Sequence, residues 1–166
     1  MIHLIPNFAT LAPTSRLWVY ASARPFTATE ITPISDVLAT FVNGWKAHGN
    51  DLDANYAIHR NQFILIAVDE AQSNASGCAI DKSVHLMQQL EQQFNLQLMD
   101  RSLVFYIDAN NEVAHFKFNT AETLLANNTI NANTLIFDTA ITRLNASLEV
   151  ELKNTWLSKY LGAEVV

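Results

Sequence analysis

A run of six apolar residues, Phe63 to Val68, constrains the fold of this chain more than any other stretch. A strand that is apolar at every position must be covered on both faces, so it belongs at the centre of a sheet. Asp69 and Glu70 end the run and lead through a polar loop into an amphipathic helix. The apolar residues of this helix recur at helical spacing: Ile80, Val84, Met87, Leu90 and Phe94. We therefore expect a central strand whose sheet is covered by this helix.

The segment before this run predicts a strand followed by a helix. Leu17 to Ser22 alternates in side-chain character, which is typical of a strand. Thr27 and Glu30 then form a capping box at the start of an amphipathic helix. Pro33 leaves a second start open, in which Thr32 is the N-cap and the proline occupies the first helical position.

Gly49 predicts the end of this helix, because glycine enters a left-handed cap at little cost. His48, just before it, would then complement the negative C-terminal end of the helix. Asn55 to His59 and the apolar run that follows are separated by three polar residues, so they predict a hairpin.

The remainder of the chain predicts two more strand pairs around a short helix. The first pair is expected over Leu103 to Ile107 and Glu112 to Phe118. A short helix begins near Asn119. The second pair is expected over Thr134 to Ile141 and Ser147 to Leu152.

The order of these elements predicts the fold class. Over residues 17–107 it is strand, helix, strand, strand, helix, strand, which is the order of a ferredoxin-like βαββαβ sandwich. We therefore predict an α+β fold of this type with a C-terminal extension of helix and β-hairpin. No linker and no internal repeat is visible, so a single α+β domain over residues 1–166 is expected.

The charge balance and the single cysteine narrow the function classes. Ten Lys and Arg against sixteen Asp and Glu give a net charge of −6, which lacks the positive surplus that nucleic acids and anionic membranes require. Cys78 alone cannot form an internal disulfide, and the five histidines lack the spacing of metal ligands. No stretch has the pattern of a signal peptide or a membrane span. We expect a cytoplasmic protein without a metal or another cofactor.

The loop after the central strand has only a superficial likeness to a nucleotide-binding loop. Lys82 and Ser83 follow Gly77, but Asp81 stands where a P-loop has its second glycine. A carboxylate at that place would also repel phosphates. We therefore exclude a P-loop, while Ser76, Gly77, Lys82 and Ser83 stay candidates for binding a ligand at the helix start.

Cys78 is the candidate nucleophile at the same helix start. With Ser76 as N-cap, Cys78 occupies the second helical position, where free backbone N–H groups and the helix dipole favour a thiolate. Lys82 lies one turn further on the same side. His85, two turns on, is roughly 10 Å away and too far to act as a direct base. The alternative is a cysteine that behaves as a small buried hydrophobe.

Four further residues are candidates for chemistry or binding. Asp69 and Glu70 lie where the central strand ends, and they could act as acid, base or cation ligand. The alternative is that both carboxylates accept hydrogen bonds from loop amides. His48 is a candidate for proton transfer, and Arg24 is a candidate for binding an anion.

Several stretches match the pattern of a known protein family. They are Leu17-Trp18-Val19-Tyr20, Arg24 with Phe26-Thr27, His48-Gly49, Ala67-Val68-Asp69-Glu70 and Ala75-Ser76-Gly77-Cys78 with Ile80-Asp81-Lys82-Ser83-Val84. Through them, nearly the whole chain resembles an uncharacterised bacterial family that often carries the label "ABC transporter ATPase". The chain differs from that pattern at Ala79, at Glu151 and at Thr155-Trp156-Leu157. The label does not fit these residues, because the chain has no Walker A loop and is too short for an ATP-binding cassette.

The sequence leaves two main functions open. The first is a small binding or regulatory domain whose loop and helix start, residues 69–83, hold an anionic small molecule or a protein partner. The second is a thiol-dependent enzyme that uses Cys78 as nucleophile or redox thiol, with Asp69, Glu70 or His48 supplying proton transfer. A homodimer formed through exposed aromatic side chains is a third possibility.

Overall fold

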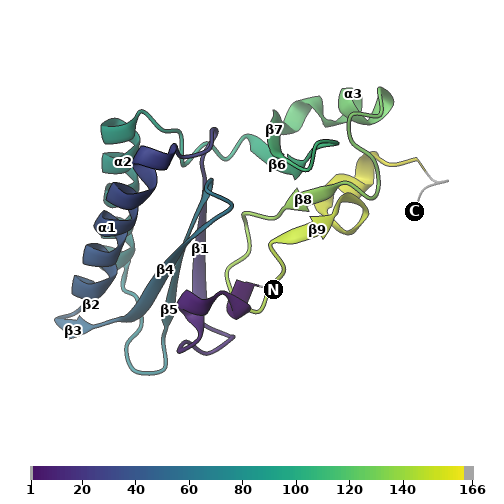
Figure 1. The fold of residues 1–166 in the computed structure, drawn as a ribbon. Coiled ribbons are helices and arrows are strands. Elements are labelled where there is room, and N and C mark those ends of the chain that lie inside the picture. Colours follow the sequence, from purple (N-terminus) through teal and green to yellow (C-terminus); the bar gives the residue numbers. More distant parts are fainter. Residues whose placement is uncertain (1, 163–166) are drawn as a thin grey trace. The chain divides into compact units, whose positions relative to one another are not determined.

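The computed structural model describes residues 2–162 (Figure 1). The chain forms two compact units. The N-terminal unit contains residues 2–99 and 140–146, and the C-terminal unit contains residues 100–139 and 147–162. Helices and antiparallel sheets occur together, so the predicted α+β class is confirmed. The single domain stays a prediction, because a division into compact units does not test whether either unit folds alone.

A three-stranded antiparallel sheet forms the centre of the N-terminal unit. Its order is β1 (Arg16–Ala21), β5 (Phe63–Asp69) and β4 (Asp53–His59). The six side chains from Phe63 to Val68 are fully buried, which confirms that the apolar run is a central strand covered on both faces. The predicted hairpin between β4 and β5 is also confirmed, and its turn contains two residues with left-handed backbone.

Helices α1 (Ala28–Gly44) and α2 (Gly77–Phe94) cover one face of this sheet (Figure 1). The predicted capping box begins α1, because the Thr27 N–H donates to Glu30 Oε1 at 3.2 Å. Pro33 therefore lies inside the helix and not at its start. The fully buried side chains between the helices and the sheet include Ile34, Leu38, Ile64, Ile66, Val68, Met87 and Leu90.

The prediction that the first helix ends at Gly49 is wrong. Helix α1 ends at Gly44 and is followed by a small hairpin of β2 (Lys46–Ala47) and β3 (Asn50–Asp51). His48 and Gly49 form its turn, with φ of 51° and 79°. The same left-handed backbone serves a helix C-cap and a two-residue hairpin turn, so the glycine alone does not distinguish them.

The start of α2 agrees with the sequence, and its buried face agrees in part. Ser76 is the N-cap, and its Oγ accepts a hydrogen bond from the Ala79 N–H at 3.2 Å. Trp45 Nε1 donates to the Ala79 carbonyl at 2.9 Å, which ties the end of α1 to the first turn of α2. The buried residues of α2 are Ala79, Ser83, Leu86, Met87 and Leu90, of which the last two belong to the predicted stripe. Ile80 and Phe94 of that stripe are partly buried against the same core.

The C-terminal unit contains a four-stranded antiparallel sheet and the short helix α3 (Ala121–Ala126). The order of its strands is β7 (Val113–Lys117), β6 (Leu103–Ile107), β8 (Leu135–Phe137) and β9 (Glu149–Glu151). Both predicted strand pairs are confirmed, although β8 and β9 are shorter than expected. The 3-10 helices of residues 2–162 are η1 (Ile2–Leu4), η2 (Pro6–Phe8), η3 (Phe118–Thr120), η4 (Leu152–Asn154) and η5 (Trp156–Tyr160).

The ferredoxin-like topology is not confirmed. In the N-terminal unit, β5 lies between β1 and β4, as a split βαβ arrangement requires. However, β6, the expected fourth strand, belongs to the sheet of the C-terminal unit. The outer edge of β1 pairs instead with residues 142–144. The Leu17 N–H donates to the Thr142 carbonyl at 2.9 Å, and the Leu144 N–H donates to the Ser15 carbonyl at 3.1 Å.

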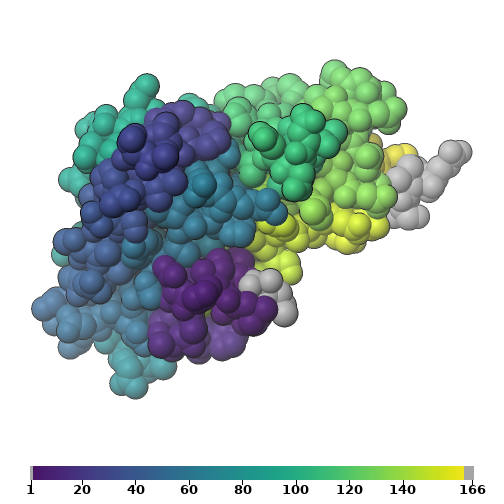
Figure 2. Space-filling model, in the orientation of Figure 1, coloured from purple at the N-terminus to yellow at the C-terminus, as the bar shows by residue number. Residues whose placement is uncertain are grey.

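The N-terminal residues pack beside β4. Asn7 Nδ2 donates to the Tyr56 carbonyl at 2.7 Å, and Asn55 Nδ2 donates to the Asn7 carbonyl at 2.5 Å. Figure 2 shows these purple residues lying against the blue residues of the N-terminal unit. Phe8 and Leu11 are buried, so this segment contributes to the core as well as to the surface.

A bidentate ion pair links the start of α1 to the end of α2. The Arg24 guanidinium donates to both carboxylate oxygens of Glu30, at 2.9 and 3.1 Å, and to the Phe94 carbonyl at 2.7 Å. The hydrogen bonds from Arg24, with those from Thr27, lower the pKa of Glu30 from 4.5 to about 2. Because the pKa is lower in the folded state, ionised Glu30 stabilises the fold above the unfolded pKa, and this stabilisation is lost as the pH falls through the folded pKa.

We expect Glu30→Gln to lower the free energy of unfolding at neutral pH by about 1 kcal/mol. The difference from the native chain should shrink as the pH falls from about 5 to about 2, because Glu30 becomes protonated over that range. Urea unfolding at a series of pH values measures this difference in the free energy of unfolding. Asp36→Asn, an exposed change in the same helix, is the control. A difference that does not vary with pH would contradict this assignment.

Candidate functional site

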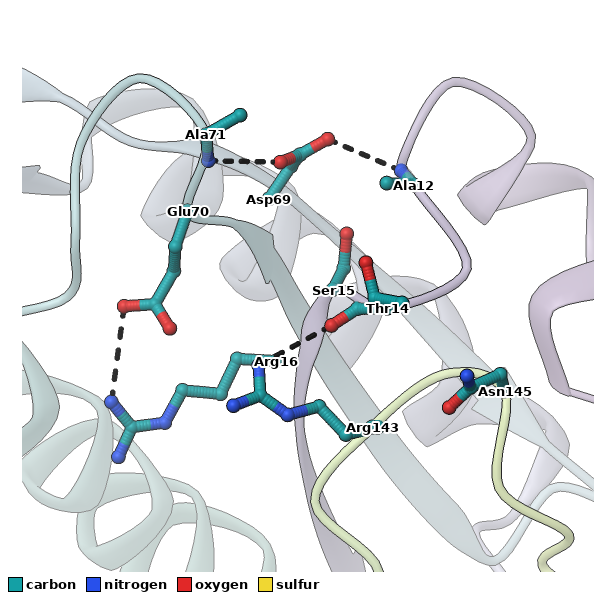
Figure 3. A pocket seen from close by; sticks show the side chains of 9 residues that line it. All are labelled: Ala12, Thr14, Ser15, Arg16, Asp69, Glu70, Ala71, Arg143 and Asn145. Atoms are coloured by element: carbon teal, nitrogen blue, oxygen red, sulfur yellow. Dashed lines mark hydrogen bonds and ion pairs between the residues drawn. The ribbon is translucent and has the colours of Figure 1, made fainter.

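The antiparallel pairing of β1 with β5 brings the start of one strand to the end of the other. Arg16 pairs with Val68, so the two carboxylates that follow the central strand lie beside the first residue of β1. Figure 3 shows Arg16, Asp69 and Glu70 gathered at this end of the sheet. The structure thus brings the predicted residues Asp69 and Glu70 to a basic residue that the sequence analysis did not select.

Asp69 holds two backbone segments in place. Its Oδ2 accepts a hydrogen bond from the Ala12 N–H at 3.2 Å, and its Oδ1 accepts one from the Ala71 N–H at 3.0 Å. Both oxygens therefore serve the backbone, which was the alternative role for this residue. Figure 3 shows the carboxylate turned toward Ala12 and away from the arginines.

Glu70 is bonded to the loop through one oxygen only. Its Oε2 accepts a hydrogen bond from the Ala75 N–H at 2.9 Å, just before the cap of α2. The same oxygen lies 3.9 Å from Arg16 Nη1. This separation is short enough for an ion pair but too long for a hydrogen bond. The side chain of Glu70 is 21% exposed, so the carboxylate is reachable from solvent.

Arg16 keeps its hydrogen-bond donors free. Its guanidinium carbon lies 4.8 Å from the centre of the Trp18 ring, a cation–π contact that holds the side chain in place without using an N–H group. Within residues 2–162 the guanidinium makes no hydrogen bond, since Glu70 is 3.9 Å away. Five N–H donors in a planar fork are therefore available to a ligand.

Arg143 reaches the same place from a distant part of the chain. It belongs to the segment that pairs with the outer edge of β1, where it forms an isolated bridge with Arg16. One of its Nη1 hydrogens bonds to the Thr14 carbonyl at 3.3 Å. Figure 3 shows the side chains of Arg143 and Arg16 running toward the same side, with the Glu70 carboxylate above the Arg16 guanidinium.

These residues surround a hollow of about 460 Å³ in the N-terminal unit, which we call the arginine hollow. Its volume lies within the range of small-molecule sites. Its lining residues are Ala12, Thr14, Ser15, Arg16, Asp69, Glu70, Ala71, Arg143 and Asn145. Ser15 is only 3% exposed, and its Oγ is buried without a hydrogen-bond partner among the described residues.

The predicted helix-start residues lie outside the arginine hollow. Gly77, Cys78 and Lys82 are exposed on α2 and do not line it. Ser76 serves as the cap of α2. Ser83 is buried, and its Oγ donates to the Ile80 carbonyl of its own helix at 2.6 Å.

The structure does not bring His48 or Arg24 to the hollow either. His48 is exposed at the tip of the β2–β3 hairpin, four residues beyond the end of α1, so it does not complement the end of that helix. The guanidinium of Arg24 is bonded to Glu30 and to the Phe94 carbonyl, which gives it a structural role between α1 and α2. Neither residue lines the arginine hollow.

Cys78 has no acid or base bonded to it. Its thiol is free and exposed, and it makes no hydrogen bond with another described residue. Over residues 2–162, no three His, Cys, Asp or Glu side chains gather into a group that could hold a metal ion. No helix of the same residues is long and apolar enough to span a membrane.

Sequence reasoning missed Ser15, Arg16 and Arg143. A signal for Arg16 was present, because pairing the two predicted strands antiparallel places the first residue of one beside the last residue of the other. Arg143 had no such signal. It approaches β1 through a single bridge at the turn of a long connection, and that pairing has no periodic pattern in the sequence.

Comparisons with known proteins found no matching family model, no matching curated protein and no matching solved structure. The resemblance to the family labelled "ABC transporter ATPase" therefore stays a prediction. Any function has to be argued from the residues of the site.

We expect Asp69→Ala to destabilise the chain by about 2 kcal/mol, because two backbone N–H groups lose a charged acceptor. Asp69→Asn should cost less, since the amide oxygen can still accept one of the two hydrogen bonds. Urea unfolding measures both free energies, with Asp36→Ala as an exposed control. An Asp69→Ala chain as stable as the control would show that these bonds do not hold the loop.

Proposed function

We propose that the chain is a binding domain for a small molecule with an anionic group, held in the arginine hollow. The observation that carries this proposal is the meeting of Arg16 and Arg143, from distant parts of the sequence, in one hollow. A guanidinium fork matches the geometry of carboxylate and phosphate groups. The chain has only ten basic residues, and two of them line this one hollow beside Asp69 and Glu70, so guanidinium donors rather than net positive charge mark the site.

The state of the two guanidinium groups supports this function. Arg16 makes no hydrogen bond within the described residues, and Arg143 makes one to a backbone carbonyl. Structural arginines usually have their donors bonded, as Arg24 does here with Glu30 and the Phe94 carbonyl. The contrast with Arg24 favours a binding role for the other two.

This proposal moves the binding site from the helix start to the other side of the same loop. Asp69 and Glu70 belong to both versions, whereas Gly77, Cys78 and Lys82 do not line the hollow. The thiol-dependent enzyme, a protein partner and a homodimer stay predictions from the sequence.

Titration calorimetry with pentanoate and with inorganic phosphate tests the proposal. The two probes separate a preference for carboxylate from one for phosphate. We expect at least one to bind with a dissociation constant of about 1 mM. Arg16→Gln and Arg143→Gln should each weaken that binding by about tenfold or more, because each removes charge-assisted hydrogen bonds.

Two control variants accompany the titration. Lys46→Gln removes a positive charge from the exposed β2–β3 hairpin, outside the hollow, and should leave binding unchanged. Cys78→Ser should also leave it unchanged, because the thiol does not line the hollow. Failure of the chain to bind a carboxylate or phosphate group in any probe, or binding that neither arginine variant weakens, would overturn the proposed function.

A further inference from the structure

The arginine hollow contains charges of both signs. Arg16 and Arg143 contribute two positive charges, and Asp69 and Glu70 contribute two negative charges. The formal charges of the four side chains cancel, so the hollow as a whole does not attract a bare anion by long-range Coulomb forces. A ligand is favoured when its own charges are separated in the same way as those of the hollow.

The separation between Arg16 and Glu70 shows what kind of ligand fits. Arg16 Nη1 and Glu70 Oε2 are 3.9 Å apart, so they face each other without a hydrogen bond. Glu70 Oε1 accepts no hydrogen bond from another described residue, and the Arg16 guanidinium donates none. The two charged groups are thus neighbours, and each has bonding capacity that its neighbour does not use.

We propose that the arginine hollow binds a free α-amino acid through its adjacent carboxylate and ammonium groups. This inference rests on the proposed function and names the class of its ligand. The ligand carboxylate accepts hydrogen bonds from Arg16 and Arg143, and the ligand ammonium donates to Glu70. An α-amino acid carries the two groups on one carbon atom, so its charges are spaced closely enough to meet neighbouring protein groups.

Glu70 and Asp69 have different parts in this arrangement. Asp69 uses both oxygens on the Ala12 and Ala71 amides and is turned away from the arginines (Figure 3). Glu70 uses one oxygen on the Ala75 amide and points its carboxylate toward Arg16. Glu70 is therefore the residue that selects for an ammonium group, while Asp69 positions the loop that carries it.

The hollow is large enough for a ligand of this class. Its volume of about 460 Å³ is sufficient for a single amino acid. The apolar contribution comes from Ala12 and Ala71, whose small side chains leave room for an aliphatic group.

Three matched probes test this inference on the native chain by calorimetry. L-norvaline carries both charged groups, pentanoate lacks the ammonium, and butylamine lacks the carboxylate. We expect norvaline to bind about tenfold or more tightly than either of the others, since each lacks one set of charge-assisted hydrogen bonds.

Glu70→Gln removes the negative charge but keeps an oxygen that can accept from the Ala75 amide, so the loop should stay in place. In this variant the advantage of norvaline over pentanoate should disappear. Asp36→Asn, an exposed change on α1, should preserve it. Thermal unfolding of the variants checks that they are folded.

The outcomes separate this inference from the proposed function. If pentanoate or phosphate binds as tightly as norvaline, and the arginine variants weaken that binding, the amino-acid inference is overturned and the proposed anion site is retained. A norvaline advantage that survives Glu70→Gln also overturns it. Failure of norvaline, pentanoate and phosphate alike overturns both.

Discussion

The burial of strand β5 is the constraint on which the N-terminal unit depends. Six consecutive fully buried residues leave no polar side chain until Asp69, so the first charged groups of this strand emerge at its end. The antiparallel neighbour β1 begins at that same end with Arg16. Oppositely charged side chains therefore meet at one end of the sheet, because the lengths and the register of these two strands place them there.

The chemistry of the hollow follows from which of its charged groups already make hydrogen bonds within the fold. Asp69 is committed to two backbone amides, and Arg24, elsewhere in the unit, is committed to Glu30. Arg16 and Glu70 face each other at 3.9 Å with donors and an acceptor to spare. A charged pair that is close but not hydrogen-bonded contributes little to stability in water, so both groups can bond to a third group without losing a strong interaction. A binding site is favoured here because Arg16 and Glu70 have unused donors and an unused acceptor, whereas Asp69 and Arg24 are hydrogen-bonded.

The individual strands and helices were predictable from the sequence because each has a signal in a few neighbouring residues. The apolar run identified the central strand, Thr27 and Glu30 identified the start of α1, and Ser76 identified the start of α2. Gly49 misled the prediction, because a left-handed glycine fits a hairpin turn as well as a helix end. Element order did not predict the sheet to which β6 belongs. The hydrophobic pattern of β6 fits the N-terminal sheet, where it was expected, as well as the C-terminal sheet, where it lies. Two of the four charged residues of the candidate site, Asp69 and Glu70, were found in the same way, whereas Arg143 depends on a pairing between segments more than a hundred residues apart.

Nuclear magnetic resonance of the arginine side chains shows whether Arg16 and Arg143 bind a ligand together. The Nε–Hε signals of Arg16 and Arg143 can be assigned by comparison with the Arg16→Gln and Arg143→Gln chains. We expect both signals to shift and saturate together as a ligand with a carboxylate group, norvaline or pentanoate, is added, while the Arg24 signal stays unchanged because its guanidinium is bonded to Glu30. Signals from Arg16 and Arg143 that do not move at a ligand concentration that shifts other residues would contradict it.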